Sequence, residues 1–154
     1  MDESDIQALI EGTVKCFSTL VDAGTEVLAP YLVPDEGVPL LDYTGVISVS
    51  GARVGSIYFT APSALIRHIL VKHGRTDINE QVMADVVGEV ANTISGNARR
   101  VFGHEFEISV PRVLTGKDEL KTLKLGQRAF IVPIAWRQYQ AALVVSLTEN
   151  LGSL

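Results

Sequence analysis

Two pairs of apolar segments, each divided by a short turn, constrain the fold of this chain most strongly. The first pair covers residues 44–50 and 53–60 on either side of Gly51, and the second covers residues 129–137 and 140–148. Glycine suits the tight turn of a β-hairpin because it tolerates backbone angles that other residues avoid. Strands joined so closely run antiparallel. The sequence therefore predicts two β-hairpins within a mostly antiparallel sheet.

Two helical patterns precede the centre of the chain. The first is expected to begin at Ser4, as its N-cap, and to end near Gly24. The second is expected to carry Pro62 in its first turn and to end at Gly74. Both show apolar residues at the spacing of a helix that is buried on one side. Such helices need a surface to cover, and the predicted sheet provides it.

A third helix is expected from the capping-box sequence 76–80 to about Phe102. The proline-rich segment 30–39 predicts a loop or partly extended connection, residues 105–110 alternate as a strand, and residues 117–125 form a charged connection. Together these elements predict an α/β protein of the α+β type, with helices packed on one mostly antiparallel sheet.

Length and composition fit one domain over residues 1–154. A chain of 154 residues buries roughly two-thirds of its unfolded surface, and 47% of the residues here are hydrophobic. The single cysteine, Cys16, excludes an intramolecular disulfide framework and a cysteine-built zinc site. It lies at the edge of the apolar side of the first helix, which predicts a packed, unreactive thiol.

Net charge and hydropathy limit the kinds of partner and the cellular compartment that the sequence predicts. A net charge of −5 and a pI near 5.1 argue against nucleic acid, which rewards clustered lysine and arginine. The first five residues are acidic where a secretory leader is basic, and the longest apolar runs are far shorter than the ~20 residues of a membrane helix. We expect a cytoplasmic protein with no membrane segment.

The third helix carries a polar stripe opposite its apolar side. Asp85, Glu89, Asn92 and Gly96 fall within roughly 60° around the helix axis. The opposite side holds Met83, Val86, Val87, Val90, Ile94, Ala98 and Val101. A carboxylate beside a carboxamide on a rigid helix can bind a cationic group and orient a water molecule. By spacing alone, however, an ordinary solvated helix surface is the more common explanation of such a pair.

Two glycines interrupt this helix, each at a cost of about 1 kcal/mol relative to alanine. Gly88 is explained by close approach of a neighbouring helix. Gly96 lies on the polar stripe, where a bare backbone would let the surface of another protein come close.

Residues 85–98 resemble the signature of the CheC/CheX/FliY family of chemotaxis phosphatases. The signature reads Asp or Ser, then Glu, then Asn, and here it is Asp85, Glu89 and Asn92, followed by Gly96-Asn97-Ala98. The order of the predicted elements is similar to that family across nearly the whole chain, which implies a CheC-like fold. One copy of the signature and the short length resemble the CheX branch.

One feature departs from the family pattern. The proline that follows the signature, Pro111, comes earlier than in the family, although residues 112–116 resemble the usual continuation. A shorter connecting loop explains the difference and affects the rim of the site more than its chemistry.

The resemblance implies a phosphatase that acts on the aspartyl phosphate of a response-regulator receiver domain such as CheY. Asn92 would enter the receiver and position the attacking water, while Glu89 would pair with the receiver's active-site lysine. Asp85 and Gly96 would contact the partner. The protein would need no cofactor of its own, because Mg²⁺ would be held by the receiver. An exposed carboxylate is a weak base at neutral pH, so we favour an anchoring role for Glu89 over general-base catalysis.

Two alternatives to an enzyme stay open at this stage. One is a non-catalytic receiver-binding or scaffold module with the same fold, and the other is a structural dimer with no receiver partner. We expect the phosphatase to be a homodimer, because the last two strands are long and apolar, and an edge of that kind pairs readily with another chain.

Other motifs have little support. His104-Glu105 resembles the start of a zinc-protease motif, but position 108 is isoleucine, so the second ligand is missing. His68 and His73 are five residues apart, which places them on different sides of a helix. Arg99-Arg100 suits the negative end of the helix dipole. No P-loop, dinucleotide-binding motif or serine-hydrolase motif occurs in the sequence.

Overall fold

The computed structural model describes residues 3–22, 24–103, 105–116, 122–123 and 129–149. The helices are α1 (Glu3–Leu20), α2 (Ser63–Lys72) and α3 (Glu80–Phe102). The long strands are β4 (Tyr43–Gly51), β5 (Arg53–Ala61), β9 (Phe130–Trp136) and β10 (Tyr139–Glu149). The short strands are β1 (Glu26–Val27), β2 (Tyr31–Leu32), β3 (Val38–Pro39), β6 (Phe106–Ile108), β7 (Arg112–Thr115) and β8 (Thr122–Leu123).

Both predicted hairpins are confirmed. β4 pairs with β5 and β9 pairs with β10, and every pairing in the sheet is antiparallel. Gly51 has a φ of +99°, and a side chain there would collide with the carbonyl oxygen of Glu105, so this turn requires glycine. The strand order is β1-β9-β10-β5-β4-β6, with β2 also on β9 and β7 also on β4.

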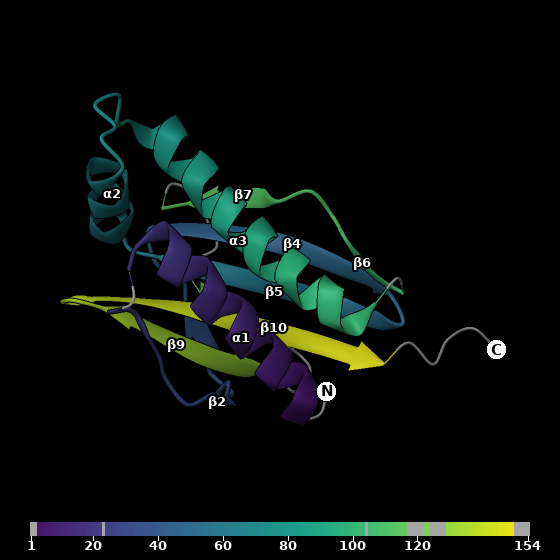
Figure 1. Cartoon of the computed structure of the whole chain (residues 1–154). Coiled ribbons are helices and arrows are strands. Elements are labelled where there is room, and N and C mark those ends of the chain that lie inside the picture. Colours follow the sequence, from purple (N-terminus) through teal and green to yellow (C-terminus); the bar gives the residue numbers. More distant parts are fainter. Residues whose placement is uncertain (1–2, 23, 104, 117–121, 124–128, 150–154) are drawn as a thin grey trace.

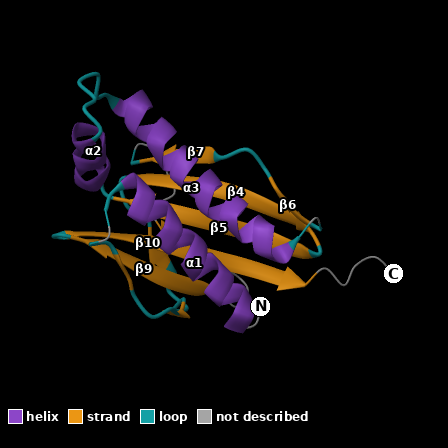
Figure 2. Ribbon diagram, viewed as in Figure 1, coloured by secondary structure: helices purple, strands orange, loops and turns teal. Residues whose placement is uncertain are grey.

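The helices cover one face of the sheet. Figure 1 and Figure 2 show α1 and α3 side by side across the long strands, with α2 at one end. The apolar side of α3 supplies the fully buried Val87 and Ile94, which belong to the same core as Ile47 and Phe59 of the sheet. The predicted arrangement of helices on one antiparallel sheet is therefore correct.

The opposite face of the sheet is covered only in part. Ile131 and Val144 point away from the helices, because side chains alternate between the faces along a strand. They form a second cluster with Val38, flanked by Val33 and Leu40. The segment predicted as a loop or partly extended connection thus contains β2 and β3 and covers this part of the sheet.

Three local predictions need correction. Ser4 lies inside the first turn of α1, which begins one residue earlier, at Glu3. Pro62 is the N-cap of α2 and not part of its first turn. Asn79 caps α3 directly: its backbone is extended, and its side-chain oxygen accepts a hydrogen bond of 2.9 Å from the N–H of Val82. A direct cap one residue before the helix displaces the predicted capping box.

The reason given for a dimer is also wrong. β10 lies between β9 and β5, inside the sheet, and the outer side of β9 is paired with β1 and β2. The sheet edge here is formed by β1 and β2, where Leu28, Tyr31 and Leu32 are 44%, 52% and 49% exposed. The last hairpin therefore presents no free edge along these pairings.

Some predictions concern residues outside those described. His104 and most of the connection 117–125 belong to this group, apart from the backbone of β8, which pairs with β3. Among the described residues, no helix is long and apolar enough to cross a membrane.

Candidate functional site

Helix α3 is fixed at its start and along its length. The Asn79 cap holds its first turn, and its last residue is followed by Gly103, with a φ of +91°. A Cβ atom on Gly45 of β4 would lie 3.0 Å from both the Cβ of Ala91 and the carbonyl oxygen of Val87. The helix therefore rests on the strand at the closest approach that glycine allows.

Helix α1 braces α3 at a second close crossing. A Cβ on Gly12 would lie 3.2 Å from the Cβ of Asn97 and from the carbonyl oxygen of Ile94. The side-chain amide of Asn97 also donates a hydrogen bond of 3.4 Å to the carbonyl oxygen of Gly12. Side chains on the outward face of α3 thus project from a helix that is held on two sides.

The structure places the four predicted residues on that outward face. Asp85, Glu89 and Asn92 are exposed, and Gly96 is half-buried. Among the residues that the structure describes, the side chains of Glu89 and Asn92 form no hydrogen bond or ion pair. Asp85 differs, because it accepts a hydrogen bond of 2.8 Å from Gln81 within the same helix. The carboxylate and the amide are therefore open to a partner, while Asp85 is partly engaged.

The two glycines of α3 have different surroundings. A Cβ on Gly96 would meet no atom within 4 Å, as expected for an open surface. A Cβ on Gly88 would lie 3.2 Å from Val113 of β7 and 3.5 Å from Pro111. The prediction that a helix approaches Gly88 is wrong, since the neighbour is the segment that leads into β7. This segment fills one flank of α3.

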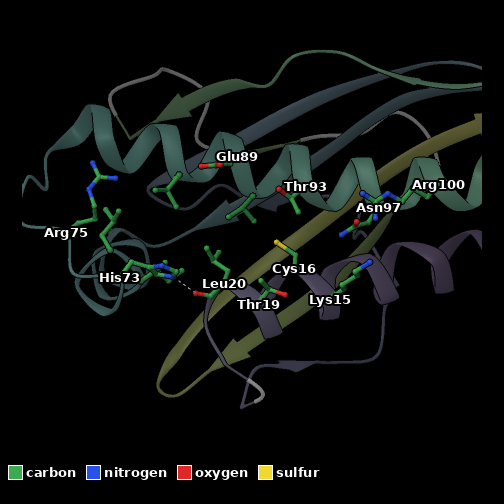
Figure 3. A pocket seen from close by; sticks show the side chains of 14 residues that line it. Lys15, Cys16, Thr19, Leu20, His73, Arg75, Glu89, Thr93, Asn97 and Arg100 are labelled. Atoms are coloured by element: carbon green, nitrogen blue, oxygen red, sulfur yellow. Dashed lines mark hydrogen bonds between the residues drawn. The ribbon is translucent and has the colours of Figure 1, made fainter.

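The other flank of α3 borders a groove of about 630 Å³ (Figure 3). Helices α1, α2 and α3 all contribute to its lining, and Glu89 stands on its rim. The lining does not include Asn92. The apolar part of the groove is formed by Cys16, Leu20, Ile69, Leu70, Val86 and Val90.

Basic side chains line both ends of the groove. Lys15 and Arg100 lie at one end, and His73 and Arg75 lie at the other (Figure 3). A ring nitrogen of His73 lies 2.6 Å from the carbonyl oxygen of Leu20 and donates to it, which joins α2 to the end of α1. Arg75 is paired with Asp77 through two hydrogen bonds of 2.8 Å.

The thiol of Cys16 lies in the groove and is buried, as the sequence predicts. Burial raises the pKa of the Cys16 thiol to about 11, and the nearby carboxylate of Glu89 contributes to the rise. The thiol is therefore protonated at neutral pH and behaves as a small packed side chain.

The sequence did not reveal the groove. Arg99 and Arg100 looked equivalent at the helix end, yet Arg99 donates to the carbonyl oxygen of Phe106 at 3.0 Å while Arg100 lines the groove. The helical spacing of Cys16 and Leu20 indicated one face of α1. Nothing in the sequence indicated which part of α3 this face would meet, because that depends on where the two helices cross.

Solved structures define the class of this fold. A CheC-like superfamily protein from Shewanella sp. PV-4 matches with a TM-score of 0.81 and 25% identity, over 96% of this chain and 99% of that chain. The chemotaxis protein CheX from Vibrio vulnificus matches with a TM-score of 0.78 and 22% identity, over 94% and 99%. The chain thus has a CheC-like fold.

A third match is the CheX–CheY–BeF3–Mg²⁺ complex from Borrelia burgdorferi. It has a TM-score of 0.75 and 20% identity, and it covers 94% of this chain and 97% of that chain. The family model described as chemotaxis phosphatase CheX matches residues 43–135. The chain belongs to this family. A comparison with curated protein sequences found no match.

Proposed function

We propose that this protein hydrolyses the aspartyl phosphate of a CheY-like receiver domain, with Asn92 positioning the attacking water. The observation that carries the proposal is the exposure of Asn92 and Glu89, one helical turn apart on a helix held by β4 and α1. Both side chains are available to a docking protein.

Phosphoryl transfer requires mainly positioning and electrostatic stabilisation from the protein. The Asn92 amide can donate one hydrogen bond and accept another without adding negative charge beside the phosphoryl group. Its short side chain reaches an acyl phosphate only if the helix itself enters the receiver's pocket. The open surface at Gly96 supports such an approach.

Glu89 acts as the anchor in this proposal. Its carboxylate pairs with the active-site lysine of the receiver, and a charge-assisted contact of this kind contributes about 1.5–3 kcal/mol. Asp85, one turn earlier, lies at the rim of the docking surface, where its bond to Gln81 keeps it in place.

The metal in this reaction belongs to the receiver. The Borrelia burgdorferi complex pairs CheX with CheY, BeF3 and Mg²⁺. By analogy, Mg²⁺ on the receiver neutralises the developing charge here, and this chain contributes the amide and the carboxylate. The cytoplasm is the compartment that we propose for this reaction.

We likewise propose that residues 1–154 form one domain and that the chain acts as a homodimer. The exposed apolar side chains of Leu28, Tyr31 and Leu32 along the β1–β2 edge support pairing there. Sedimentation equilibrium is expected to give twice the chain mass, and a value of one chain mass at micromolar concentration would reject the dimer.

The test of the function is phosphate release from a phosphorylated receiver by the wild type, Asn92→Ala and Glu89→Ala. Asn92→Ala is expected to lose about 10²-fold in maximal rate, comparable to the removal of one positioned donor. Glu89→Ala is expected to raise the half-saturating receiver concentration instead. Ala64→Ser, an exposed position on α2, is the control and should leave both parameters unchanged.

The same assay separates the enzyme from a non-catalytic module. A module that only binds receivers would retain affinity while the wild type releases no phosphate above the receiver's own rate. Equal maximal rates for the wild type and Asn92→Ala would reject the role of the amide.

A further inference from the structure

The two flanks of α3 beside the proposed site differ. On one side, Pro111 and Val113 fill the space against Gly88. On the other side lies the groove of about 630 Å³, with Glu89 on its rim. A protein that pairs with the Glu89 carboxylate therefore lies beside this groove, because Glu89 itself lines it.

The groove has the size and chemistry of a specific binding site. Its volume falls within the range of about 300–1,000 Å³ that is typical of ligand sites, and its floor is apolar, including Leu20, Ile69 and Val90. Apolar surface of this kind contributes binding energy when a partner covers it.

The charges on the groove lining indicate which kind of segment binds there. The chain carries a net charge of −5, yet the end of the groove beside Asn97 presents Lys15 from α1 and Arg100 from α3. Both side chains are exposed, and neither forms an ion pair within the described part of the chain. They differ in this from Arg75 at the other end, which is neutralised by Asp77. Two unneutralised cations beside an apolar floor are complementary to an acidic segment that also carries apolar side chains.

We propose that the groove between α1 and α3 takes an acidic, apolar segment of the receiver that lies next to its phosphorylation pocket, and that Lys15 and Arg100 select for it. This inference rests on the proposed function and extends it. Asn92 and Glu89 act on features common to receivers, whereas the groove distinguishes one receiver from another.

The test is phosphate release at several receiver concentrations, combined with direct binding of the receiver loaded with BeF3 and Mg²⁺. Lys15→Glu and Arg100→Glu are each expected to raise the half-saturating concentration at least about fivefold at low ionic strength and to keep the maximal rate within about twofold of wild type. The difference should shrink at 0.5 M salt, because screening weakens exposed charge pairs. Arg67→Glu, on the exposed side of α2 and outside the groove, makes the same change in charge and serves as the control.

A second pair of variants tests occupancy without a change in charge. Thr19→Trp fills the groove from α1, and Ser18→Trp places the same side chain on the exposed surface beside it. Thr19→Trp is expected to weaken binding of the loaded receiver about tenfold, and Ser18→Trp is expected to leave it within twofold.

Three results would overturn the inference: groove variants that behave like their controls, a lower maximal rate with unchanged binding, or a changed oligomeric state with unchanged receiver affinity. The last result would assign the groove to a second copy of the chain. Failure of the wild type to release phosphate would reject the proposed function, whereas binding of the loaded receiver would still decide the role of the groove.

Discussion

Gly88 and Gly96 lie on the same helix and lose the same helical propensity relative to alanine, yet their surroundings differ. Gly96 has open space where a side chain would be, and Gly88 faces Val113 at 3.2 Å from an added Cβ. At the residue scale, an added methyl group would have to displace Val113 at position 88 and would displace nothing at position 96.

This contrast predicts different changes in stability for two alanine substitutions. Gly96→Ala is expected to raise the free energy of unfolding by up to about 1 kcal/mol, because only the gain in helix propensity applies. Gly88→Ala is expected to gain less or to lose stability, since Val113 must move. Urea denaturation of both variants measures the difference, and equal gains at the two positions would contradict the packing described for β7.

The Cys16 thiol gives a second prediction at this scale. Its pKa of about 11 compares with an ordinary value of 9.0, so at pH 8 its thiolate fraction is lower by roughly 10²-fold. Reaction with a disulfide reagent should therefore be at least that much slower in the native protein than in urea. Comparable rates in the two states would show that the groove floor is open to the reagent.

At the scale of elements, the position of α3 depends on its contact with β4. Gly45→Ala would place a Cβ 3.0 Å from the Cβ of Ala91 and from the backbone oxygen of Val87, and neither can move without shifting the helix. We expect a loss of about 1–3 kcal/mol in unfolding free energy. Chemical denaturation measures it, with Gly96→Ala as the control for an added methyl group. A neutral effect would mean that α3 is not seated closely on the strand.

The predictable part of the elements follows from local patterns. The end of α3 at Phe102 is predicted by the helical spacing of its apolar residues. The turn at Gly51 is predicted by the glycine itself, which has a positive φ. The cap at Asn79 and the strand β7 were missed for different reasons. Asn79 was missed because it lies within the longer capping motif 76–80, which also predicts a helix start. Strand β7 was missed because it is short and pairs with β4, more than 60 positions away in the sequence.

At the scale of the whole molecule, Asp22 connects three elements. Its carboxylate accepts hydrogen bonds from the N–H of Gly24 at 2.8 Å and from the indole of Trp136 at 3.0 Å, and it lies 3.9 Å from the Lys72 ammonium. The backbone bond from Gly24, aided by Trp136 and Lys72, holds the pKa of Asp22 below its ordinary value of 3.8.

A lowered pKa in the folded state means that the ionised group stabilises the fold above pH 3.8 and that this contribution is lost as the pH falls through the folded-state pKa. Asp22→Asn is therefore expected to lower the Tm at pH 7, with the difference from wild type shrinking as the pH falls below 3.8. Thermal scans across this range measure it. Asp35→Asn, at an exposed position before β3, is the control, and a difference independent of pH would contradict the account.

The site was predictable only in part: residues that share one helix could be grouped from the sequence, and residues on different helices could not. Asp85, Glu89, Asn92 and Gly96 share a face because they share a helix, so their spacing is sufficient to group them. The groove joins Lys15 of α1 with Arg100 of α3, 85 positions apart in the sequence, and depends on where the two helices cross at Gly12. Long-range geometry of this kind has no signature in local sequence.

The central claim is that the Asn92 amide positions water in the chemical step. Single-turnover dephosphorylation of a phosphorylated receiver, at a protein concentration that saturates binding, tests it most directly. We expect Asn92→Ala to bind the receiver loaded with BeF3 and Mg²⁺ within about threefold of wild type but to release phosphate about 10²-fold more slowly. A rate constant equal to that of wild type under saturation would contradict it.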